Sequence, residues 1–315
     1  MAYAHDPEVF DRSLALYVKG EIQAAYDLLT KEAANYPDHE QRIYEWRLDM
    51  AAKMGKLELA EEILEDALDS GFFYGEFALR KDDDVQVLQG RPFFESLVQR
   101  SFQMLADAQA YSRPRLVIID RGHAVDGKVP LFLALHGNNS TADKFKIYWR
   151  SLVNKEWLVA LPQSSQVGGK DIYVWNNMDT VEKELTEHYR KLSSEYAVDP
   201  MKTIISGFSK GGHAAIVAAL KQQFAMKGFI AIAPYIPNLE DLIALLDTSS
   251  QRNLHGYMLL GEEDHECTPG ALQLHQEFTK RGFQCKAEVF PGLGHEFPDD
   301  FDQILPRAVD FVLGR

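Results

Sequence analysis

The chain has 315 residues, roughly twice the length of an ordinary domain, so we expect either two domains or one large one. Hydrophobic residues make up 46% of the chain and charged residues 25%, a composition that excludes wholesale disorder. The formal net charge of −14 repels phosphate backbones and anionic lipids, which argues against nucleic-acid and membrane partners.

The N-terminal stretch and the cysteines indicate the expected cellular compartment. The N-terminal stretch MAYAHDPEVFDRS lacks the basic and apolar segments of an export signal, and no apolar run reaches the roughly 18 residues of a membrane span. Cys267 and Cys285 are too few for a disulfide framework, and no zinc site uses their spacing. We therefore expect a cytoplasmic protein whose two cysteines serve packing.

Residues 1–110 are predicted to form a helical domain. Apolar residues recur at helical spacing from Pro7 to about Ala110, and Gly20 and Gly55 each separate two such segments. The spacing predicts two helical hairpins. With small residues at Ala24, Ala25 and Ala60, where paired helices would touch, the pattern resembles degenerate tetratricopeptide repeats.

Two hairpins are fewer than a repeat array needs to close its own core. We therefore expect an apolar face of residues 1–110 to be buried against the rest of the chain or against a second copy in a homodimer. The candidates for that face are aromatic: Phe72, Phe73, Tyr74, Phe77, Phe93 and Phe94.

Residues 111–315 are predicted to form a second, α/β domain. Short β-branched runs alternate there with amphipathic segments, which predicts a mostly parallel sheet flanked by helices. The predicted strands are 115–120, 130–135, 157–161, 203–206, 229–233, 256–260 and 286–290. The predicted helices are 141–153, 180–196, 210–223, 239–247, 268–281 and 300–313.

A G-x-S-x-G motif connects a predicted strand to a helix at Gly207-Phe208-Ser209-Lys210-Gly211. This is the setting of a nucleophile elbow, which exposes a serine on a strained turn. The two glycines are needed because side chains there would collide where strand and helix meet. Alone, the motif is also compatible with a glycine-rich turn that has no catalytic role.

An acid and a histidine follow later strands in the order that a Ser-acid-His triad uses. Asp264 lies in Gly261-Glu262-Glu263-Asp264, and His295 ends Pro291-Gly292-Leu293-Gly294-His295. A serine hydroxyl needs a histidine to take its proton, and a buried carboxylate to hold that imidazole in the right tautomer. Taken separately, Asp264 fits an acidic surface turn and His295 fits a loop cap. Their order after successive predicted strands, behind the serine motif, favours the triad roles instead.

Two loops between the strands and helices are candidates for binding the reacting group. After the strand 130–135 comes His136-Gly137-Asn138-Asn139, which has the character of an oxyanion loop. The candidate donors are the backbone N–H groups of Asn138 and Lys210. Asn139 is a candidate substrate contact, and so is Trp175, which stands among Asn residues in the loop 162–177.

From Pro130 onward the sequence resembles the α/β-hydrolase superfamily, within it the esterase, phospholipase/carboxylesterase and dienelactone-hydrolase-like group. The resemblance is carried by YAVDPMKTIISGFSKGG (residues 196–212), by LALHGNN, and by the G-x-x-D and G-x-G-H loops. It implies Ser209 as nucleophile, Asp264 as acid and His295 as base, with the amides of Asn138 and Lys210 as the oxyanion hole. Lys210 departs from the Gln or Met more usual after the serine.

The leading hypothesis is a serine esterase acting on a small carboxylic ester without a cofactor or metal. Neither a Walker A motif, a dinucleotide G-x-G-x-x-G nor an H-E-x-x-H motif occurs. An acyl-peptide or aminopeptidase-type amide hydrolase stays open, as does an interaction protein that works through its helical part. Residues 1–110 are expected either to cover part of the pocket entrance or to form a dimer.

Overall fold

The first part of the chain folds into helices that pair two by two. The computed structural model describes residues 8–248 and 253–315, so the predictions made for residues 1–7 lie outside it. The helices are α1 (Glu8–Val18), α2 (Ile22–Glu32), α3 (Glu40–Lys53), α4 (Leu57–Asp69) and α5 (Pro92–Tyr111). We call the residues Glu8–Tyr111 the helical region. Gly20 and Gly55 turn the chain between paired helices with φ of +81° and +71°, the left-handed conformation that glycine adopts without strain.

Short helical turns complete the helical region between these helices. They are η1 (Ala33–Asn35), η2 (Pro37–His39), η3 (Phe77–Lys81) and η4 (Gln86–Leu88). One core fills the space between the helices, centred on fully buried side chains such as Leu29, Leu64 and Phe94. The two predicted hairpins are therefore present, and they share a core with α5, which packs against α4.

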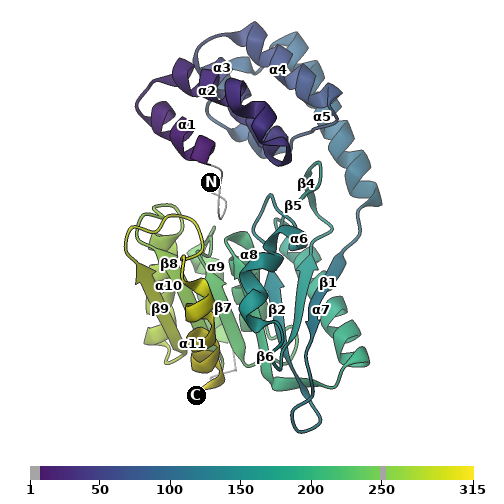
Figure 1. The fold of residues 1–315 in the computed structure, drawn as a ribbon, viewed down its shortest axis with the longest axis vertical. Coiled ribbons are helices and arrows are strands. Elements are labelled where there is room, and N and C mark those ends of the chain that lie inside the picture. Colours follow the sequence, from purple (N-terminus) through teal and green to yellow (C-terminus); the bar gives the residue numbers. More distant parts are fainter. Residues whose placement is uncertain (1–7, 249–252) are drawn as a thin grey trace.

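A seven-stranded sheet organises the remainder, which we call the sheet region (Figure 1). Its strand order is β1-β3-β2-β6-β7-β8-β9. The strands are β1 (Arg115–Arg121), β2 (Val129–Leu135), β3 (Leu158–Gln163), β6 (Val198–Phe208), β7 (Gly228–Ile232), β8 (His255–Gly261) and β9 (Gln284–Phe290). All seven predicted strands exist. Only β1 is antiparallel, paired with β3, whereas the other neighbours are parallel.

Helices cover both faces of the sheet. They are α6 (Ala142–Phe145), continued by the 3₁₀ turn η5 (Lys146–Leu152), α7 (Met178–Glu195), α8 (Lys210–Leu220), α9 (Leu239–Thr248), α10 (Thr268–Lys280) and α11 (Phe301–Leu313). In β2, Leu131, Leu133 and Leu135 enter one core while Phe132 and Ala134 enter the other. Burial on both faces explains why this strand is a continuous apolar run.

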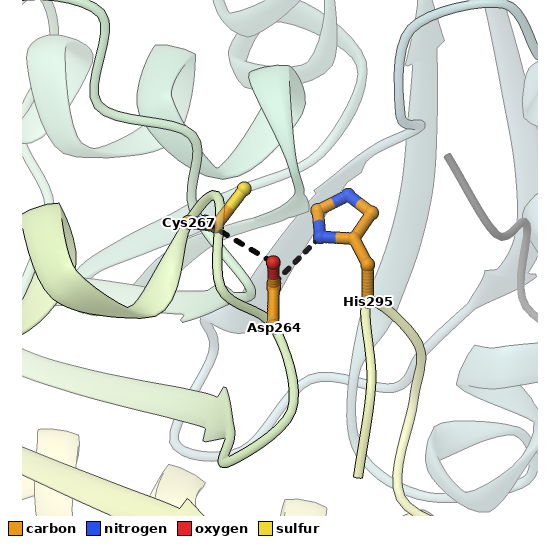
Figure 2. Close-up of side chains that lie close together, drawn as sticks. All are labelled: Asp264, Cys267 and His295. Atoms are coloured by element: carbon orange, nitrogen blue, oxygen red, sulfur yellow. Dashed lines mark hydrogen bonds and ion pairs between the residues drawn. The ribbon is translucent and has the colours of Figure 1, made fainter. Parts of the chain in front are cut away.

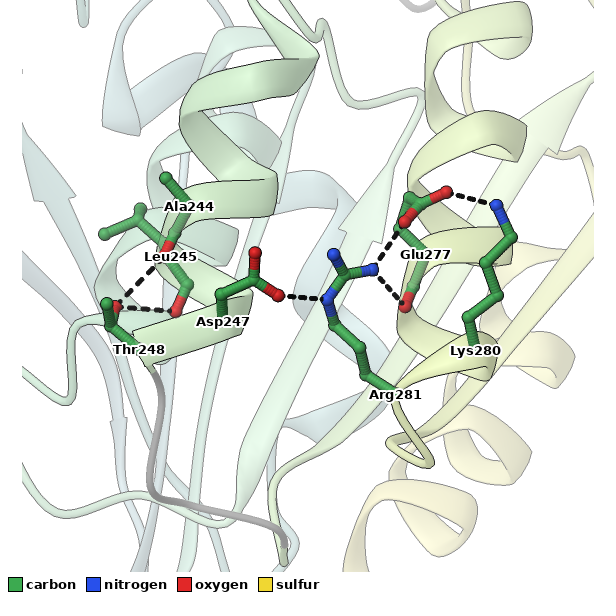
Figure 3. A network of polar contacts seen from close by, with 7 residues as sticks. All are labelled: Ala244, Leu245, Asp247, Thr248, Glu277, Lys280 and Arg281. Carbon is green, nitrogen blue, oxygen red and sulfur yellow. Dashed lines mark hydrogen bonds and ion pairs between the residues drawn. The ribbon is translucent and has the colours of Figure 1, made fainter.

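Polar contacts add to the packing of α9 against α10 (Figure 3). The Arg281 guanidinium donates to Asp247 Oδ1 at 2.6 Å and also pairs with the Glu277 carboxylate, so it joins the two helices. These groups are partly exposed, and each pair therefore contributes modestly to stability. Within residues 8–248 and 253–315, none of the helices has the length and apolarity to cross a membrane.

A small hairpin that the sequence does not predict joins the two parts of the molecule. Strands β4 (Val167–Gly169) and β5 (Ile172–Tyr173) lie in the loop after β3, and Gly169 pairs with Tyr74 of the helical region. Figure 1 shows this hairpin beneath α5, at the end of the sheet that faces the helical region. The helical region therefore does lean on the sheet region, as its small number of hairpins predicts.

The aromatic residues proposed for that contact behave differently from one another. Phe73, Tyr74 and Phe94 are all buried in the helical region's core, and Tyr74 also pairs with Gly169 of the hairpin. Phe77 and Phe93 are 69% and 45% exposed and take no part in the contact. These aromatic residues therefore do not form a single face: Phe93 and Phe94 are neighbours on α5, yet one is exposed and the other buried, because successive residues of a helix point in different directions.

Candidate active site

Ser209 lies on a sharp turn between β6 and α8. Its φ of 54° and ψ of −121° put a non-glycine residue in a rarely populated conformation, a strain that tertiary packing must hold in place. A Cβ on Gly207 would stand 2.3 Å from the Gly211 carbonyl oxygen, and one on Gly211 would stand 2.2 Å from the His136 carbonyl oxygen. The two glycines therefore let strand, helix and neighbouring loop approach each other, as the motif predicts.

Asp264 and His295 form a hydrogen-bonded pair on neighbouring loops (Figure 2). His295 Nδ1 lies 2.7 Å from Asp264 Oδ2, and the other oxygen, Oδ1, accepts from the Cys267 backbone N–H at 3.1 Å. The Asp264 side chain is 2% exposed and that of His295 is 13% exposed. The carboxylate is therefore buried and fully engaged, while the imidazole keeps an open edge.

The pKa of Asp264 reflects two opposing effects. Burial raises it, but the hydrogen bond and charge of His295, together with the Cys267 N–H, outweigh burial and hold the pKa below its usual value. The carboxylate thus stays ionised at neutral pH. The neighbouring Glu262 and Glu263 are exposed.

Two hydrogen bonds tie the acid loop to the histidine loop. The N–H of Glu263 donates to the Leu293 carbonyl at 2.8 Å, and the Gly292 N–H donates to Glu262 Oε2 at 3.0 Å. A Cβ on Gly261 would stand 2.3 Å from the Gly294 carbonyl oxygen, so the loops touch through glycine. Asp264 and His295 are therefore held in a fixed relation by the loops themselves.

Phe208 links the elbow to the other parts of the site. Its ring centroid lies 4.8 Å from that of His295, and a Cβ on Gly137 would stand 2.9 Å from its Cδ1. Ser209, the next residue, thus sits where the histidine loop and the loop after β2 converge. Within residues 8–248 and 253–315, the Ser209 hydroxyl makes no hydrogen bond to His295, a contact that often tightens only when substrate is bound.

The loop after β2 presents the predicted amide donor beside this elbow. The Asn138 backbone N–H has no acceptor among the described residues, and Lys210 opens α8, where an N–H has no acceptor within the helix. The Lys210 ammonium lies 4.5 Å from the Tyr235 ring centroid, and burial lowers its pKa. Asn139 is exposed at φ 58°, and its contact with substrate stays a prediction.

The prediction that Trp175 contacts substrate is wrong for this structure. Its side chain is fully buried in the sheet core, where Nε1 donates to the His136 carbonyl at 2.8 Å. The ring lies 4.8 Å from that of His136, and the Trp175 N–H donates to Asn138 Oδ1 at 2.7 Å. The polar neighbours of Trp175 in the sequence suggested an exposed side chain. The indole instead packs against His136 in the loop after β2 and supports that loop.

Cys267 was expected only to pack, but its N–H helps to hold Asp264. A carboxylate three residues ahead of a Cys-Thr-Pro helix start is a signal for such a contact, since the first N–H groups of a helix need acceptors. Asp264, Cys267 and His295 also form a group whose potential ligand atoms lie within 4.8 Å of one another. Burial and the Asp264 charge raise the pKa of the Cys267 thiol, which favours the protonated form over a metal-binding thiolate.

Three buried histidines make the fold sensitive to acid. Burial lowers the pKa of His136, His188 and His213 to about 4. The unfolded chain protonates near the ordinary value of about 6.5, so each group favours unfolding as the pH falls from 6.5 towards 4. We expect the free energy of unfolding to fall by on the order of 2 kcal/mol per histidine between pH 8 and pH 5.

His188 on α7 allows this expectation to be measured away from the site. Urea unfolding at pH 8 and pH 5 should show a smaller loss of stability for His188→Leu than for the wild type. The exposed His123 provides the matched control as His123→Gln. An identical pH dependence in wild type and His188→Leu would contradict the assignment of a buried neutral imidazole.

Two family models match different parts of the chain. The model described as A/B hydrolase-like, N-terminal domain matches residues 6–109, and the dienelactone hydrolase family model matches residues 163–308. Acyl-protein thioesterase 1 of Gibberella zeae is 25% identical over 148 residues, which make up 44% of this chain and 62% of that protein. The chain therefore matches less than two thirds of the length of that relative.

Solved structures show the same architecture. A crystal structure of an uncharacterized protein from Bacillus cereus ATCC 10987 matches with 28% identity and a TM-score of 0.56 over 97% of both chains. Acyl-protein thioesterase 2 of Zea mays matches with 13% identity and a TM-score of 0.50 over 65% of this chain and 100% of that one. Over residues 163–308 the chain is thus similar to the dienelactone hydrolase family, and it shares with these solved structures a mostly parallel sheet flanked by helices.

Proposed function

We propose that this chain is a hydrolase that cleaves carboxylic esters, with Ser209, His295 and Asp264 as its catalytic triad. The observation that carries the proposal is the 2.7 Å hydrogen bond between His295 Nδ1 and the buried Asp264 carboxylate, on loops that converge with the Ser209 elbow. A carboxylate in this position holds the imidazole with its other nitrogen, Nε2, free to accept a proton.

The reaction proceeds in two steps. The Ser209 oxygen attacks the ester carbonyl carbon while His295 Nε2 takes the hydroxyl proton, and the oxyanion accepts hydrogen bonds from the N–H groups of Asn138 and Lys210. The alcohol or thiol leaves with the proton held by His295. Water then attacks the acyl-enzyme, giving its proton to His295, and the free acid departs as Ser209 recovers its proton.

A small, soluble ester is the proposed substrate class. The same triad can cleave an amide, and two of the similar proteins are thioesterases, so one acyl group should be presented in three forms. We expect turnover of p-nitrophenyl butyrate and of a butyryl thioester of N-acetylcysteamine, and much slower turnover of the p-nitroanilide. Faster cleavage of the anilide would favour the amide-hydrolase alternative.

A fluorophosphonate probe followed by mass spectrometry tests the nucleophile directly. The label should appear on the tryptic peptide that contains Ser209, because only an activated serine reacts with the probe at a useful rate. A folded chain that neither labels nor turns over any of the three substrates would contradict the proposal. That result would favour an interaction protein that works through its helical region.

A further inference from the structure

Two glutamine side chains of the helical region hold the β4–β5 hairpin. Gln41 on α3 is 9% exposed, and its Oε1 accepts from the Lys170 N–H at 3.1 Å while its Nε2 donates to the Phe73 carbonyl at 3.0 Å. Gln109 on α5 accepts from the Val167 N–H at 2.9 Å and donates to the Ser165 carbonyl at 2.9 Å. Gln109 therefore satisfies two backbone groups of the hairpin segment, and Gln41 satisfies one backbone group there and one in the helical region.

The hairpin backbone also joins a segment that precedes η3. Gly169 pairs with Tyr74, whose hydroxyl donates to the Gln41 carbonyl at 2.9 Å. A Cβ on Gly169 would stand 2.2 Å from Gln41 Nε2, so the approach is closer than another residue would allow. Lys170 adds a cation–π contact, with its ammonium 4.7 Å from the Phe72 ring centroid.

The other side of the hairpin holds the loop after β2. The Tyr173 N–H donates to the Ser140 carbonyl at 3.1 Å, and a Cβ on Gly168 would stand 3.3 Å from Asn139 Oδ1. Two residues beyond β5, the Trp175 N–H donates to the Asn138 side chain at 2.7 Å. Hydrogen-bonded segments thus run without interruption from Gln41 through the hairpin to Asn138.

A two-stranded hairpin is marginally stable in isolation. With strands of three and two residues, β4–β5 needs an external support to keep one position. Gln41 and Gln109 of the helical region give part of that support, beside the pairing of Gly169 with Tyr74 and of Tyr173 with Ser140. The position of Asn138 is consequently coupled to the contact between the helical region and the sheet region.

We propose that Gln41 is a positioning residue, which fixes the Asn138 backbone N–H for oxyanion binding through the β4–β5 hairpin. The proposal rests on the function proposed above. It makes the helical region a working part of the active site without direct contact with the reacting atoms. The match of the Bacillus cereus structure over 97% of both chains fits this reading, since both regions occur together there as well.

The test replaces Gln41 by Met in the full chain, which removes both hydrogen bonds and nearly preserves side-chain volume. We expect kcat for p-nitrophenyl butyrate to fall roughly 10- to 100-fold with KM changed less than about threefold, because a misplaced donor weakens oxyanion binding rather than ester binding. A trifluoromethyl ketone, which forms a tetrahedral adduct with the serine, should lose affinity in parallel with kcat.

Two further variants separate positioning from general destabilisation. Gln109→Met removes the second support from an exposed side chain and should lower kcat in the same way, even where Gln41→Met does not fold. Glu61→Gln is the matched control, since it weakens a buried contact with Arg91 inside the helical region and leaves the hairpin untouched. Its kcat and inhibitor affinity should stay within about twofold of wild type.

The outcomes distinguish this proposal from the function on which it rests. A wild-type chain that neither turns over esters nor labels overturns both. An active wild type whose Gln41 and Gln109 variants keep kcat and inhibitor affinity within twofold overturns the positioning role alone. An equal loss in Glu61→Gln also overturns it, because the effect then follows stability rather than the hairpin.

Discussion

Replacing Ser209 by alanine is expected to abolish nearly all ester hydrolysis while the chain stays folded. Removal of a triad nucleophile lowers kcat by roughly 10⁴- to 10⁶-fold, and the residual rate comes from binding and the oxyanion hole. Alanine keeps the Cβ of serine, so the strained φ of 54° at this position costs about the same in both proteins. Steady-state kinetics measures the loss of hydrolysis, and circular dichroism of the same preparations measures whether the chain stays folded.

Ser206 provides a matched control three residues upstream. It is fully buried in β6, and its hydroxyl has no hydrogen-bond partner among the described residues. Ser206→Ala makes the same chemical change beside the elbow and should leave kcat within a few-fold of wild type. Fluorophosphonate labelling should vanish in Ser209→Ala and persist in Ser206→Ala. A Ser209→Ala protein that still hydrolyses p-nitrophenyl acetate near the wild-type rate would show that the elbow is not the catalytic centre.

The alternation of apolar strands and amphipathic helices predicted the α/β fold because both faces of the sheet are covered. Fully buried strands such as β2 and β7 are recognisable as short apolar runs. β1 is partly exposed and antiparallel, and nothing in the sequence of one strand determines the direction of its neighbour. Pairing depends on contacts between distant segments, which periodicity does not contain.

The candidate site was predictable where local backbone geometry requires particular residues. Gly207 and Gly211 are imposed by close contacts around Ser209, so the elbow has a readable motif. Trp175 and Gln41 have no such motif, since their surroundings come from segments far away in the chain. Trp175 packs on His136, and Gln41 bonds to a residue 129 positions later. The residues next to Trp175 in the sequence therefore suggested the wrong environment for it, and those next to Gln41 gave no indication of its role.

Burial, rather than the presence of a carboxylate alone, distinguishes Asp264 as the acid of the proposed triad. Three acidic residues follow β8, but Glu262 and Glu263 are exposed, whereas the Asp264 side chain is 2% exposed and contacts His295. Only a desolvated carboxylate with a fixed geometry can select one tautomer of the imidazole and stabilise the imidazolium that forms during acyl transfer. Substitutions of Asp264, Glu262 and Glu263 therefore compare a buried carboxylate with two exposed ones in the same loop.

Asp264→Asn is expected to lower kcat on the order of 10⁴-fold, because an amide can donate to Nδ1 and stabilise the tautomer that carries its proton on Nε2. That tautomer cannot accept the Ser209 proton. Raising the pH should not restore activity, since no ionisable group remains at position 264 to recover the original tautomer. Glu263→Gln makes the same carboxylate-to-amide change one residue away on an exposed side chain and should cost less than about threefold. Parallel pH–rate profiles of the wild type and both variants measure this difference, and a larger loss in Glu263→Gln than in Asp264→Asn would move the acid to the neighbouring residue.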